Sequence, residues 1–282
     1  MVRISYVSET VLNCFLLKYL RKIPQNCESV CQYLNGKRGS PHKPDRMNYI
    51  ETEKKLTAEF LGTAFLLAGI VGSGIMGENL SGGIIGIALL ANSIATGAIL
   101  AVLILIFGPL SGAHFNPAVT VSFFLQHKIG GRLATYYILV QVLGAFSGTV
   151  VAHTMFGEPL LIPSSTARTG IDQWLGEFVA TFGLIATIIG CTHTRPRAIA
   201  YAVGLYIVAG YWFTSSTSFA NPAVTLARAY TNTFSGINPD HMPIFILSQF
   251  IAAIVVTLLF RWLYKSYINY QGQSDLDEDI LK

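Results

Sequence analysis

Two asparagines occupy nearly identical settings in this chain of 282 residues, one in HFNPAVT at residues 114–120 and one in FANPAVT at residues 219–225. Asparagine is a good helix N-cap, and proline suits the first helical position, where its missing N–H is not needed. Each copy therefore predicts the start of a helix. The side-chain amides of Asn116 and Asn221 also offer donors for the oxygen of a hydroxyl compound.

The segments around these motifs have the composition of a membrane protein. Hydrophobic residues make up 52% of the chain, charged residues 12%, and the mean hydropathy is +0.50. A helix needs ~20 apolar residues to cross the hydrocarbon layer. Six stretches reach or approach this length, at about 56–77, 84–107, 133–155, 173–192, 198–214 and 242–264. The sequence therefore predicts six transmembrane helices.

The basic residues indicate the orientation of these spans. Alternate connections and the segment after the last span carry the positive charges: Lys128, Arg132, Arg195, Arg197, Arg261 and Lys265. The remaining connections hold only two basic residues, Arg168 and Arg228. The positive-inside rule then predicts that both termini are cytoplasmic. Because topology explains most of the net charge of +4, nothing in it indicates nucleic acid as a partner.

The two ends of the chain differ from its apolar centre. Residues 1–55 form a basic cytoplasmic extension, residues 56–265 the apolar domain, and residues 266–282 an acidic cytoplasmic tail. The extension is expected to be disordered, or else residues 1–46 precede a natural start at Met47. It contains three of the four cysteines (Cys14, Cys27 and Cys31), which the cytoplasm would keep reduced, and a thiol-sensing role for them is an open alternative.

Three landmarks occur twice, in the same order. AEFLGTAFLLAGI at 58–70 is echoed by GEFVATFGLIATI at 176–188, the two NPA motifs follow, and QVLGAF at 141–146 is echoed by QFIAAI at 249–254. The chain is thus predicted to be two halves of three spans each, at about 56–155 and 173–264. Because three is an odd number, the second half enters the membrane from the opposite face, which makes an inverted repeat.

The helix that begins at each NPA motif is too short to cross a membrane. The apolar stretches are PAVTVSFFLQ at 117–126 and PAVTLARAY at 222–230. A loop at membrane depth must be hidden within protein or face a water-filled cavity. We therefore expect two re-entrant half-helices that enter from opposite faces and meet near the midplane, with their positive N-terminal ends and both asparagines converging there.

Over about residues 56–265 the chain resembles the aquaporin and aquaglyceroporin (major intrinsic protein) family. The resemblance is carried by SGAHFNPAV at 111–119, the second NPA at 221–223, the paired AEF and GEF segments and the paired glutamines. The resemblance implies an all-α membrane protein, with six transmembrane helices and two re-entrant half-helices. It also implies a homotetramer in membrane lipid, with one pore per subunit for small uncharged molecules and no cofactor or metal.

Roles for individual residues follow from the resemblance. The pore motifs are Asn116, Pro117, Ala118, Asn221, Pro222 and Ala223. The carboxylates of Glu59 and Glu177 are expected to accept hydrogen bonds from loop N–H groups, since a carboxylate in an apolar span needs partners. His114 is expected to pack the first loop.

The chain departs from the family pattern at the external constriction, the selectivity filter. Most members carry arginine directly after the second NPA, whereas this chain has Val224. Counting from the motifs without gaps assigns the other filter positions to Thr96, Ala209 and Ser218, with Phe219 as the alternative to Ser218. Because Thr, Ala, Ser and Val are all small, we expect a wide filter without arginine that admits solutes larger than water.

Arg228 lies four residues beyond Val224 and therefore shares its face of the short helix. Two roles are open at this stage. Its side chain either replaces the missing charge one turn deeper in the pore or anchors an outer loop.

The small filter residues and the TSFANPAV loop resemble bacterial aquaglyceroporins associated with arsenic resistance. The resemblance implies a passive channel in the bacterial inner (plasma) membrane for water, glycerol-like polyols, urea and undissociated arsenous acid. The alternative is a glycerol, urea or water facilitator without a metalloid role. A coupled secondary transporter is disfavoured because the halves supply matched asparagines and no ionisable pair at the midplane. An enzyme is disfavoured because no nucleophile–base pair is suitably spaced.

Overall fold

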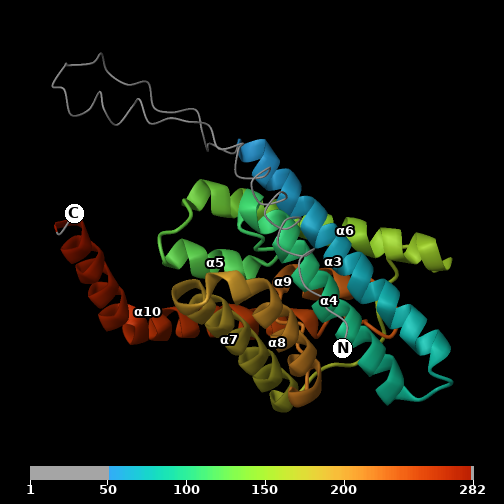
Figure 1. The fold of residues 1–282 in the computed structure, drawn as a ribbon. Helices are drawn as coiled ribbons and strands as arrows, with labels where there is room; N and C mark the ends of the chain where they lie inside the picture. The colour runs from blue at the N-terminus through green and yellow to red at the C-terminus, as the bar shows by residue number, and fades with distance from the viewer. Residues whose placement is uncertain (1–50, 281–282) are drawn as a thin grey trace, which may run out of the picture. The chain divides into compact units, whose positions relative to one another are not determined.

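The structure, a computed structural model, describes residues 51–280, with side chains described for residues 51–265. Nearly all of the predicted extension 1–55, including its three cysteines, lies outside the described residues. The regular secondary structure of the described part is all helical (Figure 1). Its helices are α3 (Thr52–Leu80), α4 (Ile85–Ser111), α5 (Pro117–Leu125), α6 (Gly131–Phe156), α7 (Ile171–Thr194), the 3-10 turn η1 (Pro196–Ala198), α8 (Ile199–Phe213), α9 (Pro222–Arg228) and α10 (Met242–Ile280).

Each of the six predicted spans corresponds to one helix. By length and composition, five helices of the described part are able to cross a membrane: α3, α4, α6, α7 and residues Met242–Lys265 of α10. The sixth, α8, has only 15 residues, or ~22 Å at 1.5 Å per residue, because η1 precedes it and the backbone becomes extended at Thr214. Beyond Lys265, α10 continues into the predicted acidic tail and ends at Ile280.

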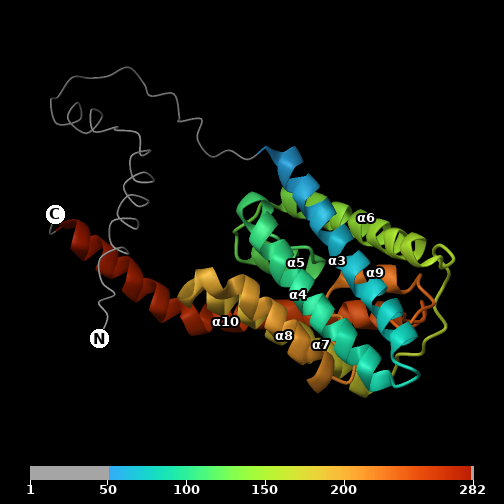
Figure 2. The same cartoon turned by 45° about the vertical axis from the view of Figure 1, so that its right-hand side comes forward.

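The order of helices repeats between the halves: α3, α4, α5 and α6 correspond to α7, α8, α9 and α10. The two half-helices exchange partners, since α5 packs against α10 and α9 packs against α6 (Figure 2). The apolar core follows the same exchange. Ala223, Val224 and Ala227 of α9 are buried in one cluster with Leu67 and Val71 of α3.

The helices α4 and α8, which occupy equivalent places in the two halves, cross at a pair of glycines. A Cβ atom on Gly97 would lie 2.5 Å from the carbonyl oxygen of Gly204, and a Cβ atom on Gly204 would lie 2.5 Å from the carbonyl oxygen of Gly97. No side chain fits at such distances, so the halves approach here backbone to backbone. Small residues at helix contacts permit this kind of packing in membranes.

Candidate functional site

The two NPA asparagines meet where the halves join. The Nδ2 atom of Asn116 donates a hydrogen bond to the carbonyl oxygen of Ala220 at 2.7 Å, and Nδ2 of Asn221 donates to the carbonyl oxygen of Phe115 at 2.8 Å. Each asparagine thus binds the loop that precedes the other. The structure brings together two motifs that are about a hundred residues apart in the sequence.

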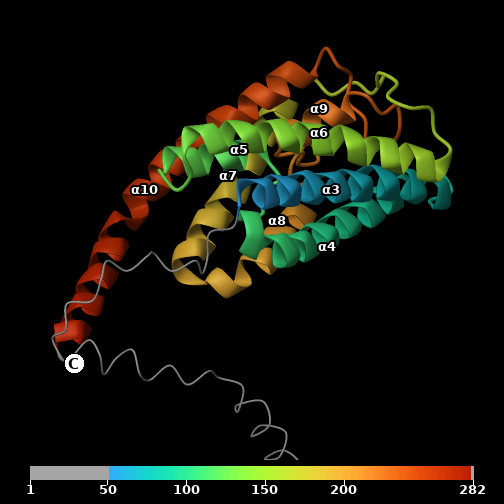
Figure 3. The same ribbon diagram turned by 90° about the horizontal axis from the view of Figure 1, so that it is seen from above.

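Each asparagine also caps its own half-helix. Oδ1 of Asn116 accepts from the backbone N–H of Ala118 at 2.9 Å, and Oδ1 of Asn221 accepts from the N–H of Ala223 at 3.0 Å. From this junction α5 and α9 extend toward opposite ends of the bundle (Figure 3). Because an amide nitrogen carries two hydrogens, each asparagine has a second donor available besides the one bound to the opposite loop.

The buried carboxylate of Glu59, which is 0% exposed, holds the first loop. Its Oε1 accepts from the hydroxyl of Ser111 at 2.6 Å and from the N–H of His114 at 2.9 Å. Its Oε2 accepts from the N–H of Phe115 at 2.7 Å and from Nε2 of Gln141 at 2.8 Å. Both oxygens of this carboxylate are therefore compensated by neutral donors.

Glu177 repeats this arrangement in the second half. Its Oε1 accepts from the N–H of Phe219 at 2.8 Å, and its Oε2 accepts from the N–H of Ala220 at 2.9 Å and from Nε2 of Gln249 at 2.6 Å. The equivalent residues Phe115 and Ala220 have φ values of 49° and 48°, a left-handed conformation that is uncommon for residues other than glycine. The carboxylates bind the N–H groups of these strained turns and keep the preceding loops in place.

His114 lies in the first loop and is buried. Its Nδ1 lies 3.0 Å from Oγ1 of Thr120, and its ring packs against the rings of Phe123 and Tyr137 at centroid distances of 4.5 and 5.3 Å. These contacts connect the loop to α5 and α6.

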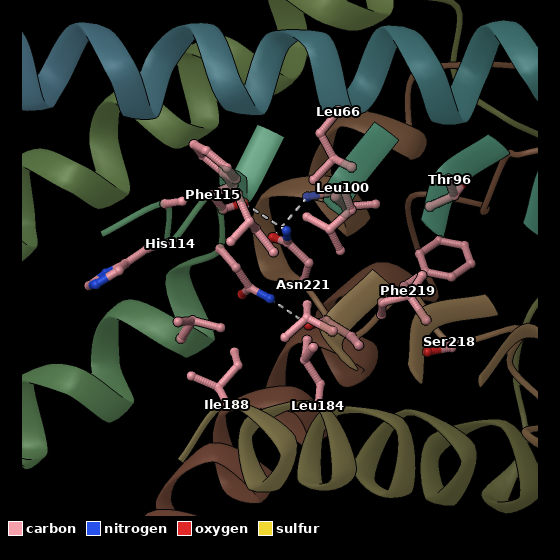
Figure 4. Close-up of a pocket in the computed structure, with 18 of the residues that line it drawn as sticks. Leu66, Thr96, Leu100, His114, Phe115, Leu184, Ile188, Ser218, Phe219 and Asn221 are labelled. Atoms are coloured by element: carbon pink, nitrogen blue, oxygen red, sulfur yellow. Dashed lines mark hydrogen bonds between the residues drawn. The ribbon is translucent and has the colours of Figure 1, made fainter. Parts of the chain in front are cut away.

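An elongated cavity of about 70 Å³ passes both asparagines. Its wall is mostly apolar and comes from α3, α4, α7 and α8: Leu66, Ile70, Leu100, Ile104, Leu184, Ile188, Val203 and Ile207. Figure 4 shows Asn221 in the middle, His114 toward one end, and Thr96, Ser218 and Phe219 gathered toward the other. The polar groups therefore occupy the centre and the ends of an apolar channel.

Three of the four predicted filter residues, Thr96, Ser218 and Val224, line this cavity. Phe219 lines it as well, so both alternatives for the loop position contribute. Thr96 places its hydroxyl 3.2 Å from the hydroxyl of Tyr211. The hydroxyl of Ser218 is buried without a hydrogen-bond partner among the described residues.

The prediction for Ala209 is wrong. This side chain is exposed on the outside of α8 and is not part of the cavity wall. The cavity face of α8 carries Val203, Ile207 and Tyr211, which are spaced four residues apart and so share one side of the helix. Ala209 is two residues from that row and points away from it. On this helix it is Tyr211, two residues beyond Ala209, that lines the cavity.

An arginine nevertheless borders the cavity near these residues. Arg228 is 2% exposed and lines the cavity. Its Nε donates to the carbonyl oxygen of Ser235 in the loop between α9 and α10, and its guanidinium carbon lies 3.4 Å from the ring centroid of Phe219. Arg228 thus both anchors the loop and borders the cavity. Because α9 runs outward from Asn221, Arg228 lies one turn farther from the junction than Val224, not deeper.

A second arginine that the sequence did not single out for the site lies close by. The guanidinium carbon of Arg168, in the connection between the halves, is 5.1 Å from the centroid of Phe219. Burial lowers the pKa of the Arg168 guanidinium from its ordinary value, and the carboxylate of Glu177 partly opposes this shift. Arg168 lies in a loop outside the repeated motifs. Neither a motif nor a periodic pattern in the sequence therefore predicts that it lies close to Phe219.

Comparison with known proteins agrees with this geometry. Residues 46–198 match the family described as MIP, Major intrinsic protein. The Aquaglyceroporin AqpS of Rhizobium meliloti is 51% identical over 217 residues, which cover 77% of this chain and 93% of the relative.

The chain belongs to the major intrinsic protein family. It is an aquaglyceroporin-type channel for small neutral solutes and not an enzyme. Another major intrinsic protein, Aquaporin AqpM of Methanothermobacter marburgensis, is 32% identical over 245 residues, covering 76% of this chain and 98% of the relative. The X-ray structure of the aquaglyceroporin from Plasmodium falciparum matches with a TM-score of 0.59 at 21% identity, covering 77% of this chain and 97% of that one, and shows the shared fold.

Proposed function

We propose that this channel conducts glycerol-like polyols, urea, water and undissociated arsenous acid down their gradients. The observation that carries the proposal is the mixed lining of the cavity. Its wall from four helices is mostly apolar, and polar groups interrupt this wall at the two asparagines and at the hydroxyls near Thr96. A polyol has the matching character, because it carries both hydroxyl groups and carbon atoms.

The asparagine amides compensate for the water that a solute loses on entry. A hydroxyl oxygen of the solute accepts the second N–H of Asn116 and then of Asn221, while its carbon atoms pass along Leu66 and Leu184. Arsenous acid at neutral pH is an uncharged triol and presents the same groups. An ion, which would lose a far larger hydration energy, finds no such compensation along the apolar wall.

The small residues near the outer end support a solute larger than water. Val224 stands where most family members have arginine, and Thr96 and Ser218 are also small. The relative AqpS, 51% identical, carries the name aquaglyceroporin. A general glycerol, urea or water facilitator without a metalloid role is the second candidate, since nothing among the described lining residues distinguishes the carbon chain of glycerol from the arsenic atom of arsenous acid.

The test measures solute entry into proteoliposomes by stopped-flow light scattering for water, glycerol, urea and arsenite. We expect wild type to pass all four. Val224→Arg should lose glycerol and arsenite before water, because a long cationic side chain then narrows the cavity. Val224→Leu is the matched apolar control and should keep more of the glycerol flux. Wild type that excludes arsenite while passing glycerol would favour the second candidate. Equal permeabilities in all three proteins would refute the filter assignment.

We also propose a homotetramer in the bacterial plasma membrane, with both termini cytoplasmic and residues 1–46 dispensable for flux. Large apolar side chains on the outer surface, including Phe65, Leu143 and Leu205, support burial in lipid or against neighbouring subunits. Native mass spectrometry should find four times the 30.7 kDa chain mass. Unequal fluxes of the full chain and a chain starting at Met47 would assign a role to the extension.

A further inference from the structure

Two arginines from distant parts of the sequence meet at the outer end of the cavity. Arg168 comes from the connection between the halves and Arg228 from the last position of α9. Both contact the same ring, that of Phe219, at 5.1 and 3.4 Å from its centroid. Phe219 and Arg228 line the cavity, so a solute on its way to the asparagines passes a cationic, aromatic surface.

Neutral groups hold both guanidinium groups in place. Nε of Arg168 donates to the carbonyl oxygen of Gly236 at 2.9 Å, and its Nη1 lies 3.3 Å from Oγ1 of Thr217. Nε of Arg228 donates to the carbonyl oxygen of Ser235. These partners fix the orientation of the two side chains without cancelling their charge.

Among the residues whose side chains the structure describes, no carboxylate forms an ion pair with Arg168 or Arg228. The acidic group close enough to influence both is Glu177, whose oxygens already accept from two loop N–H groups and Gln249. A buried charge without an ionic partner destabilises the fold. Such a charge inside a membrane protein indicates a functional role, and here it faces the solute path.

We propose that Arg228, supported by Arg168 and Phe219, is the cation barrier of this filter, moved one helical turn outward from Val224. The inference rests on the proposed channel function. A guanidinium has five N–H donors, and Arg228 gives its Nε–H to Ser235 while its guanidinium interacts with the hydroxyl of Tyr211. The remaining donors are available to a solute hydroxyl group.

This placement separates two properties that one arginine after the NPA motif would combine. A valine at position 224 leaves the cavity wider beside Thr96, whereas the charge at Arg228 repels cations one turn farther out. The width of the filter and its exclusion of cations can therefore be changed by different substitutions.

The test compares K⁺ and proton leak, followed with potential- and pH-sensitive dyes in proteoliposomes, with water and glycerol flux in the same vesicles. Arg228→Gln removes the charge but keeps an amide donor for the Ser235 carbonyl. It should raise cation leak, relative to water flux in the same vesicles, roughly tenfold or more. Arg197→Gln, an exposed arginine before α8, is the control and should leave cation leak unchanged.

A second variant distinguishes the loss of the positive charge from the loss of the hydrogen bond to Ser235. Arg228→Gln combined with Val224→Arg returns a guanidinium to the cavity one turn inward and should lower the leak toward the wild-type value, although the bond from Arg228 to Ser235 stays lost. The proposal is overturned if Arg228→Gln remains as tight to cations as wild type, or if the double variant leaks as much as the single one. Wild type without glycerol flux would contradict the proposed function, while cation leak relative to water flux would still decide this proposal.

Discussion

Buried polar side chains of the junction are the residues on which the cavity depends. The carboxylates of Glu59 and Glu177 are 0% exposed, yet their oxygens accept hydrogen bonds from loop N–H groups and from a glutamine. Gln141 and Gln249 in turn donate to Thr120 and Thr225 of the half-helices. Each carboxylate therefore connects a long helix, a strained loop and a half-helix.

Replacing either carboxylate by an amide should destabilise the protein. In Glu59→Gln or Glu177→Gln, an amide NH₂ would face N–H donors, leaving at least one of them unsatisfied at a cost of about 1–3 kcal/mol. We expect a lower unfolding temperature in detergent and reduced glycerol flux. Glu78→Gln, at an exposed position near the end of α3, is the control. Unchanged thermal unfolding of both junction variants would contradict the supporting role of these carboxylates.

Packing between elements shows how two halves become one channel. Each half-helix lies against a long helix of the other half, α5 on α10 and α9 on α6. The halves are also joined where α4 crosses α8 at Gly97 and Gly204, with Thr96 on the cavity wall one residue away. The distance between these helices therefore helps to set the width of the cavity at Thr96.

A side chain at this crossing should force the halves apart. Gly97→Val would place Cβ 2.5 Å from the Gly204 carbonyl oxygen and 2.3 Å from a methyl group of Val208. Overpacking of this kind costs about 1–3 kcal/mol, or more where backbone must move. Gly86→Val in the same helix, with no atom within 4 Å of the added Cβ, is the matched control. A Gly97→Val protein with the unfolding temperature and glycerol flux of the control would show that the crossing is not tight.

The molecule as a whole follows the inverted repeat, with half-helices directed to opposite ends from one central junction. Basic residues cluster in the connections that hold Lys128 and Arg195, while Arg168 and Asp240 lie in loops of the opposite set. The positive-inside rule assigns the first set to the cytoplasm. On that orientation the arginine pair at Phe219 would lie at the external end of the cavity.

Cysteine labelling checks this orientation in whole cells. In a background without the native cysteines, Asp240→Cys should react with a membrane-impermeant maleimide on intact cells, because this exposed position is predicted to be external. Arg195→Cys, exposed on the other set of connections, should react only after the cells are permeabilised. The reverse pattern would place both termini outside and would turn the filter toward the cytoplasm.

The sequence alone determined the features that depend on local chemistry and on repetition. Three features can be recognised without knowing which residues lie nearby in the folded protein. They are Asn-Pro at a helix start, a carboxylate in an apolar span and the order of the six spans. The doubled NPA motif therefore located Asn116 and Asn221, and the paired AEF and GEF segments located Glu59 and Glu177.

Only the tertiary structure decided which side chains border the cavity at the end near Thr96. Counting without gaps chose Ala209, whereas the face of α8 that borders the cavity carries Tyr211. Phe219 is approached by Arg228 from the end of α9 and by Arg168 from a loop, and hydrogen bonds to Ser235 and Gly236 hold these two side chains. Such contacts join residues far apart in the chain, and neither periodicity nor motif spacing records them.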